Sequence, residues 1–166
     1  KEYWSPRQKA SPANNPKNPY RVSDYFKIDP EFGTEKDVKE FINAAHQLNM
    51  HVIIDIVYWH TGPTNVLTKN LDFYQKDQNG NVKINNYGFL VLNYENKKLR
   101  EYLYNNMKWW IVDMGADGFR CDVSASIPLD FWEDSRAKLD KIRPDIGMLA
   151  ESNSTKEVLK AFDMSY

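Results

Sequence analysis

The stretch GFRCDV, residues 118–123, has the composition of a buried β-strand but carries a guanidinium and a carboxylate. Side chains alternate between the two faces of a strand, so Arg120 and Asp122 are predicted to share one face. The other face carries the residues that we expect to pack in the core, Phe119, Cys121 and Val123. The two charges indicate either a functional site or a structural ion pair, and the rest of the chain decides between these alternatives.

Helices and strands alternate on both sides of this stretch. Apolar residues at helical spacing, with Thr34 as N-cap and Asp37 three residues later, predict a helix before the first strand. The proline-rich segment 1–20 is predicted to be an irregular loop. In chain order the pattern predicts a helix within 32–49, a strand within 50–59, a helix within 96–115, a strand within 116–123, a helix within 128–142, a strand within 145–152 and a short helix within 154–162.

This order favours βαβ units and a parallel sheet, so the predicted fold class is α/β. The first strand is almost entirely apolar, which is typical of a parallel strand covered on both faces. A complete (β/α)8 barrel takes about 250 residues. A chain of 166 residues with three clear strands is therefore expected to be either part of such a barrel or an open sheet.

Residues 61–92 break the alternation. This segment of Gly, Asn, Pro and scattered aromatic residues has no clear period, and such a length is unusual in a compact domain unless the loop is functional. We interpret it as a long binding loop or a small excursion from the domain.

Composition limits the class of ligand. The chain has 22 basic and 23 acidic residues, a net charge of -1, which gives no electrostatic reason to expect nucleic acid or an anionic membrane as partner. No apolar run approaches the roughly 20 residues that span a bilayer. The single cysteine, Cys121, excludes an internal disulfide and leaves the compartment open; we place an extracytoplasmic location, secreted or periplasmic, ahead of a cytoplasmic one.

Charged residues recur where each of the three predicted strands ends. Ligands bind at this edge of parallel α/β folds, so we expect these side chains to cluster. A single structural ion pair would not need a third carboxylate from another strand, which favours a functional site. The residues are Asp55 and His60 after the first strand, Arg120 and Asp122 on the second, and Glu151 on the third.

Two carboxylates that face a cleft can hydrolyse a glycosidic bond. Asp122 is the candidate nucleophile, because Arg120 on the same face would hold it ionised. Glu151 follows the apolar run GMLA, where desolvation would raise its pKa and suit a general acid/base. Cys121 points to the opposite face and is expected to pack in the core.

Three motifs resemble, in order, the strand motifs of the α-amylase superfamily of glycoside hydrolases: FINAAHQLNMHVIIDIVYWHTG (41–62), GADGFRCDV (115–123) and MLAES (148–152). The segment 18–34 resembles the part that precedes them, and AFDMSY (161–166) resembles the start of the next strand. The resemblance covers nearly the whole chain. It implies that residues 1–166 are a fragment of one catalytic (β/α)8 domain, about strands 3 to 5 with flanking helices.

The resemblance also implies roles for the site residues. Asp122 would be the nucleophile, Arg120 its supporting cation and Glu151 the general acid/base of a retaining hydrolase that acts on α-1,4-glucans such as starch and maltodextrin. The residues implied to bind the sugar are Tyr20 as an aromatic platform, Asp55 and His60 as hydrogen-bonding groups, and Trp59 as a stacking surface.

Several positions depart from the family pattern. Trp59 and Val91 stand where the family has an Asn and an Asp, and since that Asn commonly binds a structural calcium ion, no metal ligand is assigned here. Ala125 and Ser126 replace a Lys-His pair that contacts the leaving-group sugar. The family's third catalytic aspartate has no counterpart before the last residue, so we expect the 166 residues alone to be inactive.

Other functions remain open at this stage. Within the same family the alternatives are an α-1,6-glucosidase, a neopullulanase-like enzyme and a glycosyltransferring relative. A non-catalytic glucan-binding relative is an alternative of another class. A third is an unrelated module that binds a metal through histidines and one carboxylate, namely His46, His51, His60 and Asp55.

Overall fold

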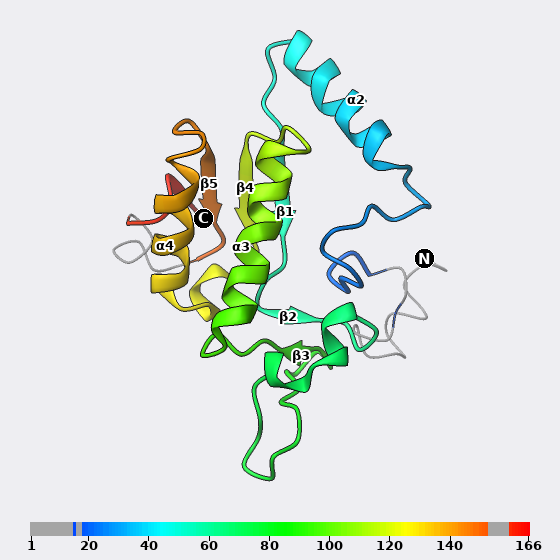
Figure 1. The fold of residues 1–166 in the computed structure, drawn as a ribbon, viewed down its shortest axis with the longest axis vertical. Helices are drawn as coiled ribbons and strands as arrows, with labels where there is room; N and C mark the ends of the chain where they lie inside the picture. The colour runs from blue at the N-terminus through cyan, green and yellow to red at the C-terminus, as the bar shows by residue number, and fades with distance from the viewer. Residues whose placement is uncertain (1–14, 16–17, 153–159) are drawn as a thin grey trace.

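Four parallel strands form the central sheet of the computed structural model, which describes residue 15, residues 18–152 and residues 160–166 (Figure 1). Every neighbouring pair in the order β1-β4-β5-β6 is parallel. The predicted α/β class is thus confirmed, including a strand within AFDMSY. The strands are β1 (Ile53–Ile56), β4 (Gly118–Cys121), β5 (Gly147–Ala150) and β6 (Met164–Ser165).

Three predicted helices are present, and two of them begin at a capping side chain. Thr34 and Asp37 form the capping box of α2 (Glu35–Gln47), and the Asn96 side chain accepts hydrogen bonds from the first turn of α3 (Lys97–Val112). The third helix, α4 (Leu129–Leu139), follows β4. Figure 1 shows α3 and α4 against the sheet, whereas α2 extends away from it.

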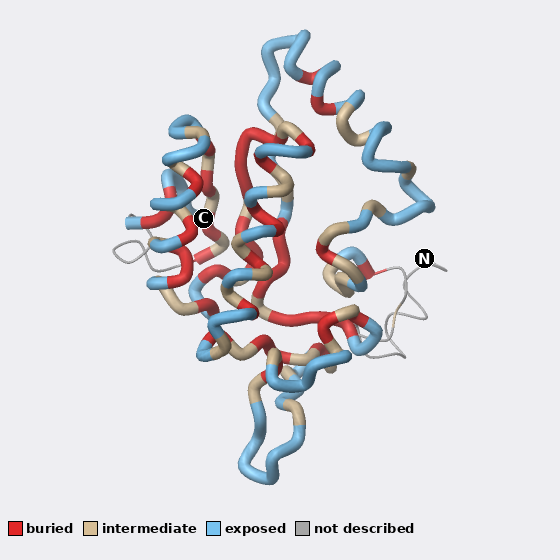
Figure 2. The backbone as a smooth tube through the Cα atoms, viewed as in Figure 1, coloured by how far each residue is buried: buried red, intermediate tan, exposed pale blue. Residues whose placement is uncertain are grey.

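The hydrophobic core lies between the sheet and helices α3 and α4. Phe119 and Cys121 of β4 are fully buried in it, as predicted, together with Leu103 of α3 and Trp132 of α4 (Figure 2). The prediction for Val123 is wrong. The strand ends at Cys121, and the half-buried Val123 adopts a left-handed conformation with φ 45°, so the alternation does not reach it.

The expectation that β1 is covered on both faces is also wrong. Ile53 remains 44% exposed and Asp55 is exposed, while Ile56 is buried. The reason is that Ile53 and Asp55 share the face of the strand opposite Ile54 and Ile56, and the core of the described residues lies only on the side of Ile54 and Ile56.

A close approach fixes the start of the β4–β5 pair. A Cβ atom on Gly118 would lie 2.0 Å from the carbonyl oxygen of Gly147, its partner in the ladder. Only glycine fits at this position, so Gly118 is required for the close pairing of β4 with β5.

The segment 61–92 is ordered as a short antiparallel pair with 3-10 turns. Strand β2 (His60–Thr61) pairs with β3 (Leu90–Val91), and an isolated bridge joins Tyr74 to Leu92. The 3-10 turns are Val66–Lys69 and Leu71–Phe73. In Figure 1 this excursion lies beyond the carboxyl ends of β1 and β4.

Two predicted segments fall largely outside the described residues: the loop within 1–20 and the short helix within 154–162. No helix in the part of the chain that the structure describes has the length and apolar character of a membrane span.

At the amino end of the sheet, Asp117 joins three elements. Its buried carboxylate accepts hydrogen bonds from the Val52 backbone N–H at 2.7 Å, from His46 Nε2 at 2.8 Å and from Arg143. Burial alone would raise the pKa of Asp117, but these donors lower it to about 2. The carboxylate therefore ties α2 and the start of β1 to β4.

We predict that Asp117→Asn lowers the free energy of unfolding of the whole protein by about 3 kcal/mol, because the buried donors lose an ionised acceptor. The folded-state pKa of about 2 lies below the ordinary value of 3.8, so this contribution is present above about pH 4 and is lost as the pH falls toward 2. Urea unfolding at pH 7, 4 and 2.5 measures it. The exposed Asp113→Asn is the control, and an equal loss in both variants would contradict the prediction.

Candidate functional site

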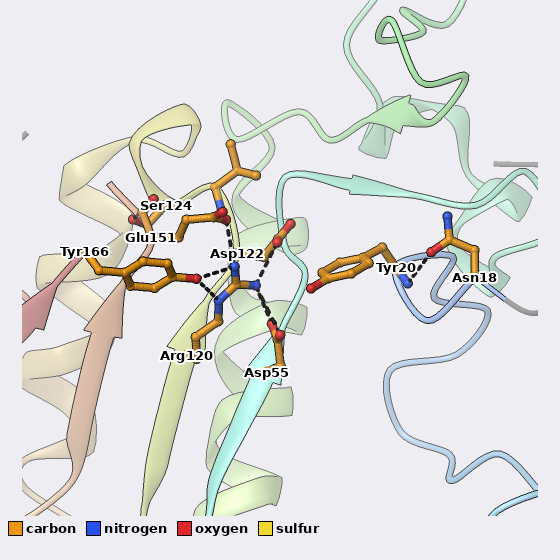
Figure 3. Close-up of polar contacts among 9 residues, drawn as sticks. Asn18, Tyr20, Asp55, Arg120, Asp122, Ser124, Glu151 and Tyr166 are labelled. Atoms are coloured by element: carbon orange, nitrogen blue, oxygen red, sulfur yellow. Dashed lines mark hydrogen bonds and ion pairs between the residues drawn. The ribbon is translucent and has the colours of Figure 1, made fainter. Parts of the chain in front are cut away.

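The guanidinium of Arg120 connects three carboxylates from three strands (Figure 3). Its Nη1 donates to Asp55 Oδ1 of β1 at 2.9 Å and to Asp122 Oδ1 at 2.8 Å, and its Nη2 pairs with Glu151 Oε2 at 2.9 Å. Burial alone would lower the pKa of Arg120, but its hydrogen bonds raise it, so it is permanently charged. The structure thus brings together four of the five residues that the sequence predicted to converge at the carboxyl edge of the sheet, and His60 lies beside them.

Asp122 is the most buried of these carboxylates, with 7% of its side chain exposed. It follows β4, and its backbone N–H donates to the Ile56 carbonyl at 3.0 Å, which continues the β1–β4 ladder. Burial raises the pKa of Asp122 to about 6; Arg120 opposes this rise, and the charges of Glu151 and Asp55 add to it. Arg120 thus lowers the pKa of Asp122, as expected, but does not cancel the effect of burial, because one cation is shared among three anions.

Glu151 is more open than the sequence suggested. Its side chain is 37% exposed, and its Oε2 accepts from the Val123 backbone N–H at 2.8 Å in addition to the Arg120 pair. The apolar surroundings expected from the GMLA run are absent from the carboxylate itself, because alternate side chains of β5 point into the core while the strand end is polar. Its backbone is held by Ser124, whose hydroxyl donates to the Glu151 carbonyl at 3.1 Å.

The left-handed conformation of Val123 serves this contact. A β-branched residue with φ 45° and ψ 43° is strained, and such strain persists where the surrounding structure enforces it. Here the conformation directs the Val123 N–H toward Glu151. The hydrogen bond from the Val123 N–H, in the residue after Asp122, therefore fixes the Glu151 carboxylate relative to Asp122.

Tyr20 and Asp55 line the exposed side of the cluster. Figure 3 shows the Tyr20 ring directed toward Asp55 and Asp122, with its backbone N–H donating to Asn18 Oδ1 at 3.0 Å. Burial, and next the charge of Asp55, raise the pKa of the Tyr20 hydroxyl, which places it within electrostatic reach of the carboxylates. An aromatic ring at this place is suited to stack on a sugar face.

His60 and Trp59 lie at the base of the excursion, next to the cluster rather than in it. His60 is 4% exposed. The half-buried Trp59 packs edge-on against its ring, with the two ring centroids 5.5 Å apart. Burial lowers the pKa of His60 to about 4, against a smaller effect of the Tyr20 backbone. The hydrogen bond from His60 to a sugar, and stacking by Trp59, stay predictions.

Sequence reasoning missed Tyr166. Its hydroxyl accepts hydrogen bonds from Arg120 Nη2 at 2.7 Å and from Arg120 Nε at 3.0 Å, so it shares Nη2 with Glu151 and also binds Nε, which contacts none of the three carboxylates. Tyr166 follows β6 directly. The same rule that located the other residues, polar groups at the carboxyl edge of a parallel strand, could have found it.

Two positions beside and within the β2–β3 pair lack the calcium ligands that the family resemblance would place there. The two positions at which the family resemblance would place oxygen ligands hold Trp59 and the buried Val91, and neither side chain has an oxygen donor. The alternative of a histidine site is contradicted by position: His46 and His51 lie near Asp117 at the amino end of the sheet, while His60 follows the carboxyl end of β1. Among the described residues no group of three or more His, Cys, Asp or Glu side chains could hold a metal.

The charge of the cluster selects its chemistry. Three carboxylates face one guanidinium, so the ionised site is negative and would repel a phosphate or carboxylate ligand. Such a site stabilises positive charge that develops at a reacting carbon, as in the oxocarbenium-like transition state of glycoside cleavage.

Comparison with known proteins agrees with this chemistry. Residues 3–81 match the family described as alpha amylase, catalytic domain. The chain is 28% identical to a cyclomaltodextrinase from a Bacillus species, over 90% of this chain and 30% of that protein. It is 27% identical to a maltogenic α-amylase from Bacillus acidopullulyticus, over 80% of this chain and 26% of that protein.

Solved structures give the same result. A maltogenic α-amylase from Thermotoga neapolitana superposes with a TM-score of 0.83 at 38% identity, over 89% of this chain and 35% of that one. An α-amylase from Lactobacillus plantarum superposes with a TM-score of 0.83 at 34% identity, over 89% and 39% of the two chains. The sheet and its helices are therefore part of a (β/α)8 barrel, and the chain spans about a third of the length of these relatives.

We predict that Glu151→Gln lowers the pKa of Asp122 below about 6. The charge of Glu151 is one of the groups that raise this pKa, and without that charge the attraction between Arg120 and the Asp122 carboxylate is opposed by one anion fewer. Carbon-13 NMR titration of labelled aspartate carboxyls measures the shift. Glu101→Gln, an exposed change on α3, is the control. An Asp122 pKa that stays the same or rises in Glu151→Gln would show that the two carboxylates are not coupled.

Proposed function

We propose that this chain, which belongs to the α-amylase superfamily, is part of a retaining glycosidase that acts on α-1,4-linked glucans. The observation that carries the proposal is the shared guanidinium: Arg120 holds Asp122 and Glu151, from neighbouring strands, at one edge of the sheet. Two carboxylates so placed are the minimum that the retaining reaction requires.

In the proposed first step an oxygen of the Asp122 carboxylate forms a bond to the anomeric carbon. The glycosidic carbon–oxygen bond breaks, and Glu151 donates its proton to the leaving oxygen. In the second step Glu151 takes a proton from water, the water oxygen bonds to the anomeric carbon, and Asp122 is released as a carboxylate. The sugar leaves with the configuration it had in the glucan.

The raised pKa of Asp122 is compatible with its role. With a pKa of about 6, most Asp122 side chains are ionised at pH 7, as a nucleophile must be. Burial that raises the pKa also strips the carboxylate of solvent, which makes it more reactive once it is ionised. Arg120 limits the rise in the pKa of Asp122, so that the carboxylate is still mostly ionised at neutral pH.

Binding of the sugar is assigned to the groups around the cluster. Asp55 and His60 would hydrogen-bond the sugar at the cleavage point, with Tyr20 as the stacking platform and Trp59 beside it. A neutral, hydroxyl-rich glucan suits a site with excess carboxylates, which repels anionic ligands.

The names of the relatives guide the order in which we rank the candidate substrates. Cyclomaltodextrinases and maltogenic amylases are among the most similar proteins, and a neopullulanase from Thermoactinomyces vulgaris is 28% identical over 86% of this chain. We place α-1,4-glucans first, and cyclic dextrins and pullulan as the substrates to be tested beside them.

We predict that Asp122→Asn and Glu151→Gln each reduce kcat of the whole protein on soluble starch by several orders of magnitude, with a smaller change in KM, because both act in the transition state. Asp113→Asn, which removes an exposed carboxylate, should keep full activity. Retention of most activity by Asp122→Asn would refute the nucleophile assignment.

A second measurement separates the two roles. An α-glucosyl fluoride has a leaving group that needs no proton, so Glu151→Gln should complete the first step and stall at the second. We expect mass spectrometry to detect a glycosyl group on the peptide that contains Asp122. Its attachment to another residue would contradict the mechanism.

We propose further that the β2–β3 region functions without calcium, since Trp59 and Val91 provide no ligand oxygen. Incubation of the whole protein with EDTA should leave starch hydrolysis and the unfolding temperature unchanged. A loss of either quantity that added calcium restores would contradict this proposal.

A further inference from the structure

The imidazole of His60 is held between two aromatic rings. Phe89 stacks on its face, with ring centroids 4.1 Å apart and planes inclined by 20°, and Trp59 meets it edge-on at 72°. The stack depends on the β2–β3 pair, in which His60 lies opposite Val91. A residue late in the excursion thus contacts His60 of β2, which is far from it in sequence.

Phe89 is fixed by its own turn. Its backbone N–H donates to the Asn85 side-chain oxygen at 3.1 Å, and its carbonyl accepts from the Asn85 N–H at 2.9 Å. Gly88, with φ 85°, closes the turn through a hydrogen bond to the Asn85 carbonyl. The ring that covers His60 is therefore in place before any ligand binds.

The ring nitrogens of His60 are the unexplained feature. Both are buried, and neither makes a hydrogen bond of regular geometry to the described residues, although the nearby Tyr20 backbone opposes the effect of burial on the pKa of the ring. A buried polar group without a partner destabilises a protein, so it calls for a ligand or a functional reason. Burial keeps the ring neutral above about pH 4, and a neutral imidazole offers one donor and one acceptor, which matches the hydroxyl groups of a sugar.

We infer that Phe89 is a positioning residue of the glucan site: its stacked ring fixes the plane of the His60 imidazole so that the ring nitrogens are oriented for sugar hydroxyls. The inference rests on the proposed function, because it assigns His60 to the bound glucan. Phe89 itself touches no substrate in this scheme. Trp59 contacts the same ring edge-on, so Phe89 and Trp59 together hold the His60 imidazole in one orientation.

A double-mutant cycle on the whole protein tests this inference, with kcat/KM for maltodextrin measured in Phe89→Leu, His60→Ala and the double variant. We expect Phe89→Leu to lower kcat/KM about tenfold in the wild-type background and by less than about twofold in the His60→Ala background. Phe89→Tyr keeps a stacking ring and should retain most of the activity. Equal losses in both backgrounds, or no loss from Phe89→Leu, would overturn the inference.

Controls separate positioning from folding and from the proposed function. Phe131→Leu changes an equally buried phenylalanine in α4, so it should reduce the unfolding temperature without the coupled loss in kcat/KM. If Phe89→Leu does not fold, the wild-type NMR spectrum decides: the His60 ring protons must be shifted upfield by the stacked Phe89, and normal shifts would overturn the inference. Failure of the proposed function would appear separately, as an absence of wild-type turnover.

Discussion

The shared ion pair of Arg120 is the interaction on which the site depends. Arg120 stands in the central position of a parallel register that pairs it with Asp55 on one side and Leu149 on the other. Because the strands are parallel and in register, their carboxyl ends meet, and one guanidinium can reach the polar groups that follow each of them. Removing it would leave three carboxylates facing one another at one edge, which is unfavourable at low dielectric.

Because one cation is shared among three carboxylates, the charge of each carboxylate is only partly neutralised. Asp122, the most buried, receives one hydrogen bond from Arg120 and has a raised pKa, whereas the side chains of Asp55 and Glu151 are more exposed to solvent. The arrangement is poor as a device for stability, since a buried pair with one cation and one anion would be better compensated. Its advantage is chemical, because the excess negative charge remains available for a positively charged transition state.

Much of this structure follows from the sequence because local rules agree with one another. The capping box at Thr34, the apolar spacing of α3 and the convergence of Arg120, Asp122 and Glu151 were all predictable from periodicity and strand topology. Val123 was not, because alternation assumes that the strand continues, and the chain leaves the strand to direct an N–H at Glu151. The open side of β1 and the stack of Phe89 on His60 depend on tertiary placement, which no local pattern contains.

The strand β4 also shows why residue type alone could not separate stabilising from reactive carboxylates. Asp117 precedes this strand and Asp122 follows it, and both side chains are nearly buried, with 6% and 7% exposed. Their pKa values nevertheless move in opposite directions, to about 2 and about 6. Asp117 has a backbone N–H, an imidazole and a guanidinium as donors, whereas Asp122 has only part of one guanidinium and two carboxylates nearby. Burial raises the pKa of both carboxylates, and the donors around Asp117 and the carboxylates around Asp122 then move the two pKa values apart, so that one serves the fold and the other is left able to react.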